Sequence, residues 1–127
     1  MGPSTEHIGG FCPRYHHAVE LIGRRWTGAI IRAMLGGVTR FSDLTQTVPG
    51  LSDRMLSERL KELEAEGIVE RTVFPETPVR IEYWVTEKGR SLAAVVDSIA
   101  TWAEEWWPLV SDGPSAAAPR AKPADAR

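Results

Sequence analysis

Two helix start signals of the same kind, Ser42-Asp43 and Ser52-Asp53, lie on either side of the stop signal Pro49-Gly50. Serine favours the N-cap position of a helix, where we expect both Ser42 and Ser52, and aspartate in the first turn complements the helix dipole. After the second signal, leucines recur at i, i+4 and i+7, which places them on one face of the second helix. Two helices joined by a tight, glycine-containing turn predict a helix-turn-helix, the motif that inserts its second helix into the major groove of DNA. The inward leucines are Leu56, Leu60 and Leu63.

Two further helices are predicted before this motif. Apolar residues occur at helical spacing over residues 15–22, and Gly23 ends that helix. The same period over residues 26–35 predicts a second helix, which the pair Gly36-Gly37 ends. The motif therefore follows a helical N-terminal segment.

The period changes to two after Gly67, where the leucine-striped helix is expected to end. Residues 79–85 alternate Val, Ile and Tyr with Arg, Glu and Trp, which is typical of a half-buried strand. Residues 68–74 are rich in β-branched side chains, and residues 75–78 supply the turn between the two strands. A hairpin directly after a helix-turn-helix is the wing of a winged helix.

The composition fits one compact domain. The chain has 127 residues, 43% of them apolar, and its 15 basic and 17 acidic residues nearly cancel. This balance excludes a histone-like protein and a wholly disordered chain, while the single cysteine excludes an internal disulfide and a cysteine-rich zinc site. No uncharged run approaches the ~20 residues of a membrane span, and nothing suggests a secretory signal. We expect a cytoplasmic α+β protein, mainly helical with one small hairpin, with a domain over 11–110, a flexible N-terminus over 1–10 and a disordered tail over 111–127.

This order of elements resembles the HxlR family of bacterial winged-helix transcriptional regulators. The match spans about 11–107 and includes the block LSDRMLSERLKELEAEGIVER at 51–71, which other winged-helix regulators such as the MarR type share. Cys12-Pro13 and the segment VRIEYWVTEKG make the assignment specific, and Arg24-Arg25 is a mild departure. The resemblance implies a DNA-binding homodimer rather than an enzyme, with the first and last helices at the two-fold contact, and we expect a repressor. The other matching segments are Ile22-Gly23, Trp26, Ile30 and Arg40-Phe41-Ser42-Asp43-Leu44.

If the leucines point inward, a polar face of the second helix points outward. Arg54 and Lys61 can reach guanine edges or phosphates from that face, and Ser57 can contact a base. The start of the preceding helix and Ser52 are expected to hold phosphates, and the wing is expected to reach an adjacent minor groove. The candidate DNA-binding residues are Thr39, Arg40, Ser42, Ser52, Arg54, Ser57, Lys61, Arg71 and Arg80.

Charge alone leaves the partner open. Residues 39–90 carry 8 basic and 10 acidic residues, so this region has no net basic footprint. Glu58 lies close to the predicted reading face, where it would repel phosphate. A winged-helix module that binds protein would suit this balance, and it predicts no salt-dependent binding of duplex DNA. If double-stranded DNA is the partner, affinity requires two half-site contacts by a homodimer on a pseudo-palindromic operator.

Residues 86–89 open a long last helix that is expected to run to Trp106. Its apolar side chains recur every seven residues, at Leu92, Ile99 and Trp106, as in a coiled-coil seam. A core helix can show the same stripe, but large aromatic residues near the end of a small domain are typical interface anchors. The tryptophans could also line a pocket for an aromatic effector. The predicted dimerisation residues are Leu92, Val96, Ile99, Trp102 and Trp106.

Cys12 is the candidate for reactive chemistry. It precedes Pro13, which favours the first helical position, so Cys12 is expected at the N-cap. The helix dipole and the nearby Arg14 would lower the pKa of the thiol there. Several HxlR-family regulators use a cysteine at this position to sense oxidants or electrophiles, whereas a lone cysteine beside Phe11 can also simply pack. The sequence leaves both roles open, and it contains no motif for a catalytic site, a cofactor or a metal.

Overall fold

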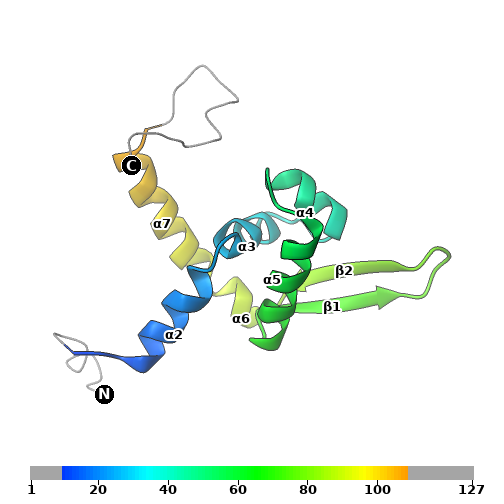
Figure 1. Ribbon diagram of the computed structural model, residues 1–127, viewed down its shortest axis with the longest axis horizontal. Helices are drawn as coiled ribbons and strands as arrows, with labels where there is room; N and C mark the ends of the chain where they lie inside the picture. Colours follow the sequence, from blue (N-terminus) through cyan, green and yellow to red (C-terminus); the bar gives the residue numbers. More distant parts are fainter. Residues whose placement is uncertain (1–9, 109–127) are drawn as a thin grey trace. The chain divides into compact units, whose positions relative to one another are not determined.

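The computed structural model describes residues 10–108, which divide into two compact units at Ser91. The first unit combines helices with a two-stranded antiparallel hairpin (Figure 1), which confirms the predicted fold class. Its elements are α2 (Pro13–Ile22), α3 (Thr27–Leu35), α4 (Phe41–Thr47), α5 (Asp53–Ala65), β1 (Val69–Phe74), β2 (Arg80–Val85) and α6 (Glu87–Arg90). The second unit contains α7 (Ala93–Trp106). The predicted tail over 111–127, and the predicted flexible N-terminus except for its last residue, lie outside the described residues.

The core of the first unit is built from α3, α4 and α5. The three leucines of the predicted stripe on α5 are buried together with Ile30, Ile31 and Leu44, so the stripe is confirmed. Burial of a side chain of this size stabilises a fold by about 1.5–3 kcal/mol. The stripe therefore determines which face of α5 is turned outward.

The second start signal of the sequence is confirmed. Ser52 is the N-cap of α5, and its Oγ accepts a hydrogen bond from the N–H of Met55 at 3.1 Å. Asp53 occupies the first turn, where its negative charge is favourable. Local chemistry is sufficient to start this helix.

The prediction that Ser42 caps the preceding helix is wrong. Helix α4 begins at Phe41, and Arg40 is its N-cap, in an extended conformation. The cause is pairing with the hairpin, because the N–H of Tyr83 donates to the carbonyl of Thr39 at 2.8 Å and Arg40 forms a β-bridge with β2. This pairing keeps the chain extended up to Arg40, so the helix starts directly after it.

The turn between α4 and α5 requires a glycine. Gly50 has a φ of +87°, a left-handed conformation that glycine adopts without steric cost. A Cβ at this position would lie 3.2 Å from the ring of Trp26, so the indole covers the turn. Trp26, predicted inside the second helix, instead precedes α3 with a φ of +78°, which is unusual for an aromatic residue. The junction of α2 and α3 thus supports the helix-turn-helix.

The hairpin pairs Val69 with Val85 at its base and Phe74 with Arg80 near its turn. Glu82, on the second strand, is a buried charged residue at 7% exposed. Its carboxylate lies 2.8 Å from the guanidinium of Arg80. A buried carboxylate needs such a partner, because burial without one would be costly.

The predicted long last helix is divided into two. Helix α6 ends at Arg90, and α7 begins at Ala93. The hydroxyl of Ser91 donates to the carbonyl of Lys88, a local contact that competes with the helical hydrogen-bond pattern. No helix within residues 10–108 is long and apolar enough to cross a membrane.

Gly89→Ala is expected to destabilise the fold, whereas Gly28→Ala is not. A Cβ on Gly89 would collide with the carbonyl oxygen of Ile68 and lie 2.7 Å from Val85 Cγ1, so α6 would have to move away from the hairpin. A Cβ on Gly28 would meet the carbonyl oxygen of Ile22 at 4.0 Å, and alanine is the better helix former. In urea unfolding we expect a loss of about 1–3 kcal/mol for Gly89→Ala and no loss for Gly28→Ala. Equal free energies of unfolding would contradict a close approach of α6 to the hairpin.

Candidate nucleic-acid interface

The outward face of α5 carries the three residues predicted to read bases. Arg54 and Lys61 are exposed, and Ser57 is half-buried, all opposite the buried leucines. The side chain of Arg54 is 89% exposed, and its Nε lies 3.5 Å from Oε2 of Glu58, one turn further on. An exposed pair of this kind contributes only about 0.3–0.5 kcal/mol, so Arg54 can exchange the carboxylate for a base or a phosphate. Ser52 is also exposed, at the N-terminus of this helix.

Three further predicted residues lie at the start of α4. Arg40 and Ser42 are exposed, and Thr39 is half-buried. A polar cleft of about 420 Å³ opens beside them, lined by Thr39, Arg40 and Asp43 among others. The structure thus brings Thr39, Arg40 and Ser42 together on one exposed segment before and within α4.

The two arginines predicted on the wing lie on opposite faces of the hairpin. Arg80 pairs with Phe74, and Arg71 lies three residues before Phe74, so strand alternation separates the two side chains. Arg71 is exposed. Arg80 is bound by Glu82 at 2.8 Å and by Glu76 at 2.9 Å, with its guanidinium 4.0 Å from the centre of the Phe74 ring. Arg71 is therefore the more accessible cation, and Arg80 is held within the wing.

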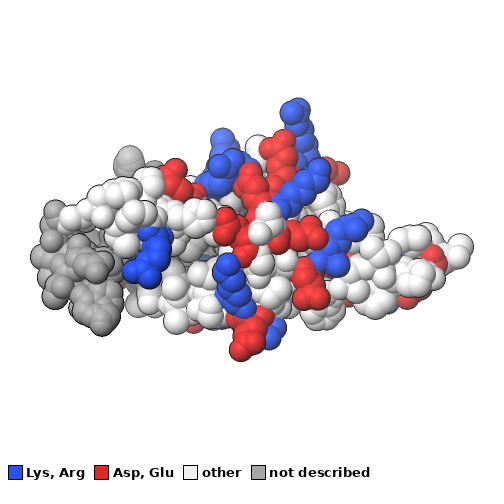
Figure 2. Space-filling model, turned by 90° about the horizontal axis from the view of Figure 1, so that it is seen from below, with Lys and Arg blue, Asp and Glu red and all other residues white. Residues whose placement is uncertain are grey.

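Basic side chains do not gather into a continuous patch on the face shown in Figure 2. Lysine and arginine alternate there with aspartate and glutamate. Ion pairs also reduce the local positive charge. Five arginines each lie 3.8 Å or less from a carboxylate oxygen, namely Arg24, Arg40, Arg54, Arg59 and Arg80. Contact with DNA would therefore depend on a few cations at defined positions rather than on a broad positive field.

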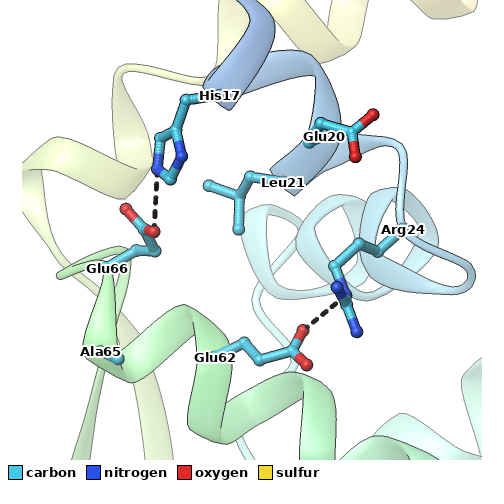
Figure 3. A pocket seen from close by; sticks show the side chains of 7 residues that line it. All are labelled: His17, Glu20, Leu21, Arg24, Glu62, Ala65 and Glu66. Atoms are coloured by element: carbon cyan, nitrogen blue, oxygen red, sulfur yellow. Dashed lines mark hydrogen bonds and ion pairs between the residues drawn. The ribbon is translucent and has the colours of Figure 1, made fainter. Parts of the chain in front are cut away.

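The C-terminal half of α5 makes two polar contacts that the sequence analysis missed. His17 Nε2 on α2 lies 3.0 Å from Glu66 Oε2, and Arg24 Nε lies 3.1 Å from Glu62 Oε1 (Figure 3). Both pairs line a cleft of about 380 Å³ between α2 and α5. The partners are far apart in the sequence, so no local pattern could have indicated them.

Arg59 is a second residue that the sequence analysis missed. It is 7% exposed, its Nε donates to the carbonyl of Arg25 at 2.9 Å, and its Nη1 donates to Glu62 at 3.0 Å. Its position between Leu56 and Leu60, on the inward side of α5, was a signal that it is structural. Arg59 fixes α5 to the turn before α3 and does not face the reading surface.

The structure places Cys12 at the N-cap of α2, half-exposed, with Pro13 in the first turn. The backbone N–H of Tyr15 lowers the pKa of the thiol, and Arg14 lowers it further, while partial burial opposes both. The thiol forms no cap hydrogen bond with any described residue, so the N–H of Tyr15 acts as a nearby dipole. Residues 10–108 contain no cluster of three or more His, Cys, Asp and Glu side chains that could bind a metal ion.

Helices α2 and α7 each expose apolar side chains, and neither contains a buried residue within its bounds. On α2 these are Tyr15 and Val19. On α7, Ile99, Trp102 and Trp106 are all more than half exposed, whereas Leu92 and Val96 are half-buried. Exposed apolar side chains of this kind are frequent at interaction surfaces.

Sequence comparisons identify relatives of this chain. The model of the HxlR-like helix-turn-helix family matches residues 21–111. The uncharacterised HTH-type transcriptional regulator YvaP of Bacillus subtilis is 53% identical over 95 residues, which are 75% of this chain and 88% of YvaP. The HTH-type transcriptional regulator YodB of the same organism is 48% identical over 95 residues, which are 75% of this chain and 85% of YodB.

Solved structures show the same winged helix-turn-helix. The reduced form of YodB gives a TM-score of 0.69 at 47% identity, covering 77% of this chain and 96% of the YodB chain. Diamide-treated YodB gives 0.65 at 48% identity, covering 76% and 95%, and quinone-bound YodB gives 0.65 at 44% identity, covering 75% and 99%. The redox regulator HypR in its oxidised form gives 0.69 at 37% identity, covering 74% and 96%.

Arg54→Ala and Arg59→Ala are expected to separate base reading from helix support. Loss of a bidentate guanine contact by Arg54 should cost about 1–3 kcal/mol and relax base preference on a duplex selected from a random library. Arg59→Ala should lower the melting temperature, because it leaves the carbonyl of Arg25 without its partner and removes one of the two arginines that contact Glu62. Fluorescence anisotropy and thermal unfolding measure the two effects. Equal loss of base preference in both variants would contradict the assignment of α5 as the reading helix.

Proposed function

Because the chain belongs to the HxlR-like helix-turn-helix family of transcriptional regulators, we propose that it is a homodimeric repressor whose hold on a pseudo-palindromic operator is released by modification of Cys12. The observation that carries the proposal is the outward face of α5, where Arg54, Ser57 and Lys61 lie opposite a fully buried stripe. The family consists of transcriptional regulators, so the chain is not an enzyme.

In this proposal α5 enters the major groove, and the elements around it hold the backbone. Ser52 offers the free N–H groups of the α5 N-terminus to a phosphate. Thr39, Arg40 and Ser42 bind the same strand from the start of α4. Arg71 reaches the adjacent minor groove from the wing, while Arg80 reaches it only by exchanging its carboxylate partners for phosphate. The proposed contacts are thus of two kinds, because some residues read bases and the others position the protein on the DNA backbone.

The second copy of the chain is proposed to cover the apolar face of α7. Trp102 and Trp106 are 56% and 64% exposed, and aromatic side chains of this size are frequent anchors of protein interfaces. A two-fold contact makes the same surface self-complementary, so one helix is sufficient to form the seam. A dimer also explains how modest half-site contacts can give useful affinity.

The double variant Trp102→Gln/Trp106→Gln is expected to be monomeric and to bind its operator weakly. Both side chains are exposed, so the change should remove the seam without unfolding the domain. Light scattering gives the mass, and footprinting on the upstream region of its own gene should show half-sites ~10 bp apart, or a multiple of that, for the native protein. Trp84→Gln, an exposed tryptophan on the wing, is the matched control and should remain dimeric. Dimers that survive the double change would place the seam elsewhere.

The switch is proposed to begin at the thiol of Cys12. Its lowered pKa raises the fraction of thiolate, the form that reacts, at neutral pH. The thiolate can add to a ring carbon of a quinone, where a C–S bond forms as the C=C π bond breaks and the carbonyl oxygens take up protons to give the hydroquinone thioether. Alternatively, two Cys12 thiols from two copies can form a disulfide while diamide accepts two electrons and two protons. The crystal structures of diamide-treated and quinone-bound YodB support such chemistry in a relative. The family match begins at residue 21, so the assignment to Cys12 depends on the geometry of this chain.

Quinone or diamide treatment is expected to lower the operator affinity of the native protein, whereas Cys12→Ser should bind DNA normally and ignore both reagents. Serine preserves the N-cap but lacks the nucleophilic thiolate. Anisotropy titrations before and after treatment provide the measurement. A tenfold loss of affinity requires a change of about 1.4 kcal/mol. If Cys12→Ser responds as the native protein does, the thiol only packs, and an aromatic ligand among the tryptophans becomes the better effector.

A further inference from the structure

Glu82 is a buried carboxylate that binds two of the arginines predicted to contact DNA. Its side chain is 9% exposed, and the same oxygen, Oε2, lies 2.8 Å from Nη1 of Arg80 and 3.8 Å from Nε of Arg40. Arg80 belongs to the wing and Arg40 to the N-terminus of α4. One carboxylate therefore shares its charge between the two positions from which cations could approach the DNA backbone.

The backbone holds these two positions together. The N–H of Tyr83 donates to the carbonyl of Thr39 at 2.8 Å, and Arg40 and Glu82 form an antiparallel bridge. Main-chain hydrogen bonds thus hold the strand that carries Glu82 beside the segment that carries Arg40. The approach of Glu82 to both arginines follows from the fold itself.

Arg80 has little charge left for a phosphate. Glu76 binds its Nη2 at 2.9 Å, the ring of Phe74 covers its guanidinium, and its Nε is buried without a hydrogen-bond partner among the described residues. Affinity for any DNA sequence depends on the number of phosphates that free cations neutralise. A cation engaged by two carboxylates adds little to that number.

We propose that Glu82 limits the affinity for duplex DNA of any sequence by neutralising Arg80 and sharing Arg40. The inference rests on the proposed DNA-binding function and adds the residue that limits binding to the DNA backbone. Phosphate contacts carry no sequence information, so this limit applies to every duplex alike. Discrimination between sequences is then left to α5, whose Arg54 is bound only by an exposed carboxylate.

The test compares Glu82→Gln with Glu70→Gln on a random-sequence 20-bp duplex. Both variants remove one negative charge from the hairpin, but Glu70 is exposed and forms no ion pair with any described residue. Glu82→Gln should steepen the slope of log affinity against log salt by about one unit more than Glu70→Gln does, because one further phosphate is neutralised. The ratio of affinities for a library-selected duplex and the random duplex should stay the same in both variants, because a further phosphate contact strengthens binding to both duplexes alike. An equal slope in the two variants, or a ratio that changes in Glu82→Gln only, would overturn the proposal.

A double variant distinguishes positioning from simple loss of structure. Glu82→Gln/Arg80→Gln should return the slope to that of Glu70→Gln, since the released cation is gone, whereas an unfolding effect would not be reversed. If Glu82→Gln does not fold, Glu76→Gln carries the test, because it frees Arg80 partly from an exposed position. A slope for Glu76→Gln equal to that of Glu70→Gln would then overturn the proposal. Absence of salt-dependent duplex binding by the native protein would instead refute the proposed function itself, and with it this inference.

Discussion

The orientation of α5 depends on the burial of one leucine stripe. Leu56, Leu60 and Leu63 are almost completely removed from solvent, and rotating the helix by a quarter turn would expose at least part of that surface. Arg59 adds a directional constraint on the same inward side, because its Nε donates to the carbonyl of Arg25 at 2.9 Å, and rotation of the helix would break this hydrogen bond. Arg54 and Lys61 are outward as a consequence of this burial. The buried leucines thus determine which residues form the reading face.

Local signals in the sequence were sufficient where local chemistry decides the structure. The Ser52 cap and the leucine period gave α5 correctly, because both act within a few residues. The same reasoning failed at Ser42, since pairing of residues 39–40 with β2 overrides the local preference for a serine cap. It also missed the burial of Glu82, which depends on Arg80, and the contact of His17 with Glu66. Periodicity describes neighbouring residues only, so it cannot indicate partners that are far apart in the sequence.

The ion pairs determine how the near-neutral charge of this chain would affect DNA binding. A formal net charge of -2 does not favour DNA binding, and five arginines of the first unit are paired with carboxylates. Exposed pairs such as Arg54 with Glu58 are weak and can be exchanged for DNA contacts, whereas the pair of Arg80 with buried Glu82 is harder to exchange. The exposure of each carboxylate therefore determines which cations are available. Few available cations limit nonspecific affinity and leave more of the binding energy to base contacts.

The contacts between α2 and α5 determine how far a change at Cys12 can reach within the first unit. His17 lies on the same helix as Cys12, about 7.5 Å further along its axis at 1.5 Å per residue. His17 contacts Glu66, and Arg24, in the turn after α2, contacts Glu62. The side chains in these two contacts are between 31% and 66% exposed, so the contacts are weak compared with the burial of the leucine stripe. A displacement of α2 would therefore break these contacts before it moved α5, and the reading face would stay in place.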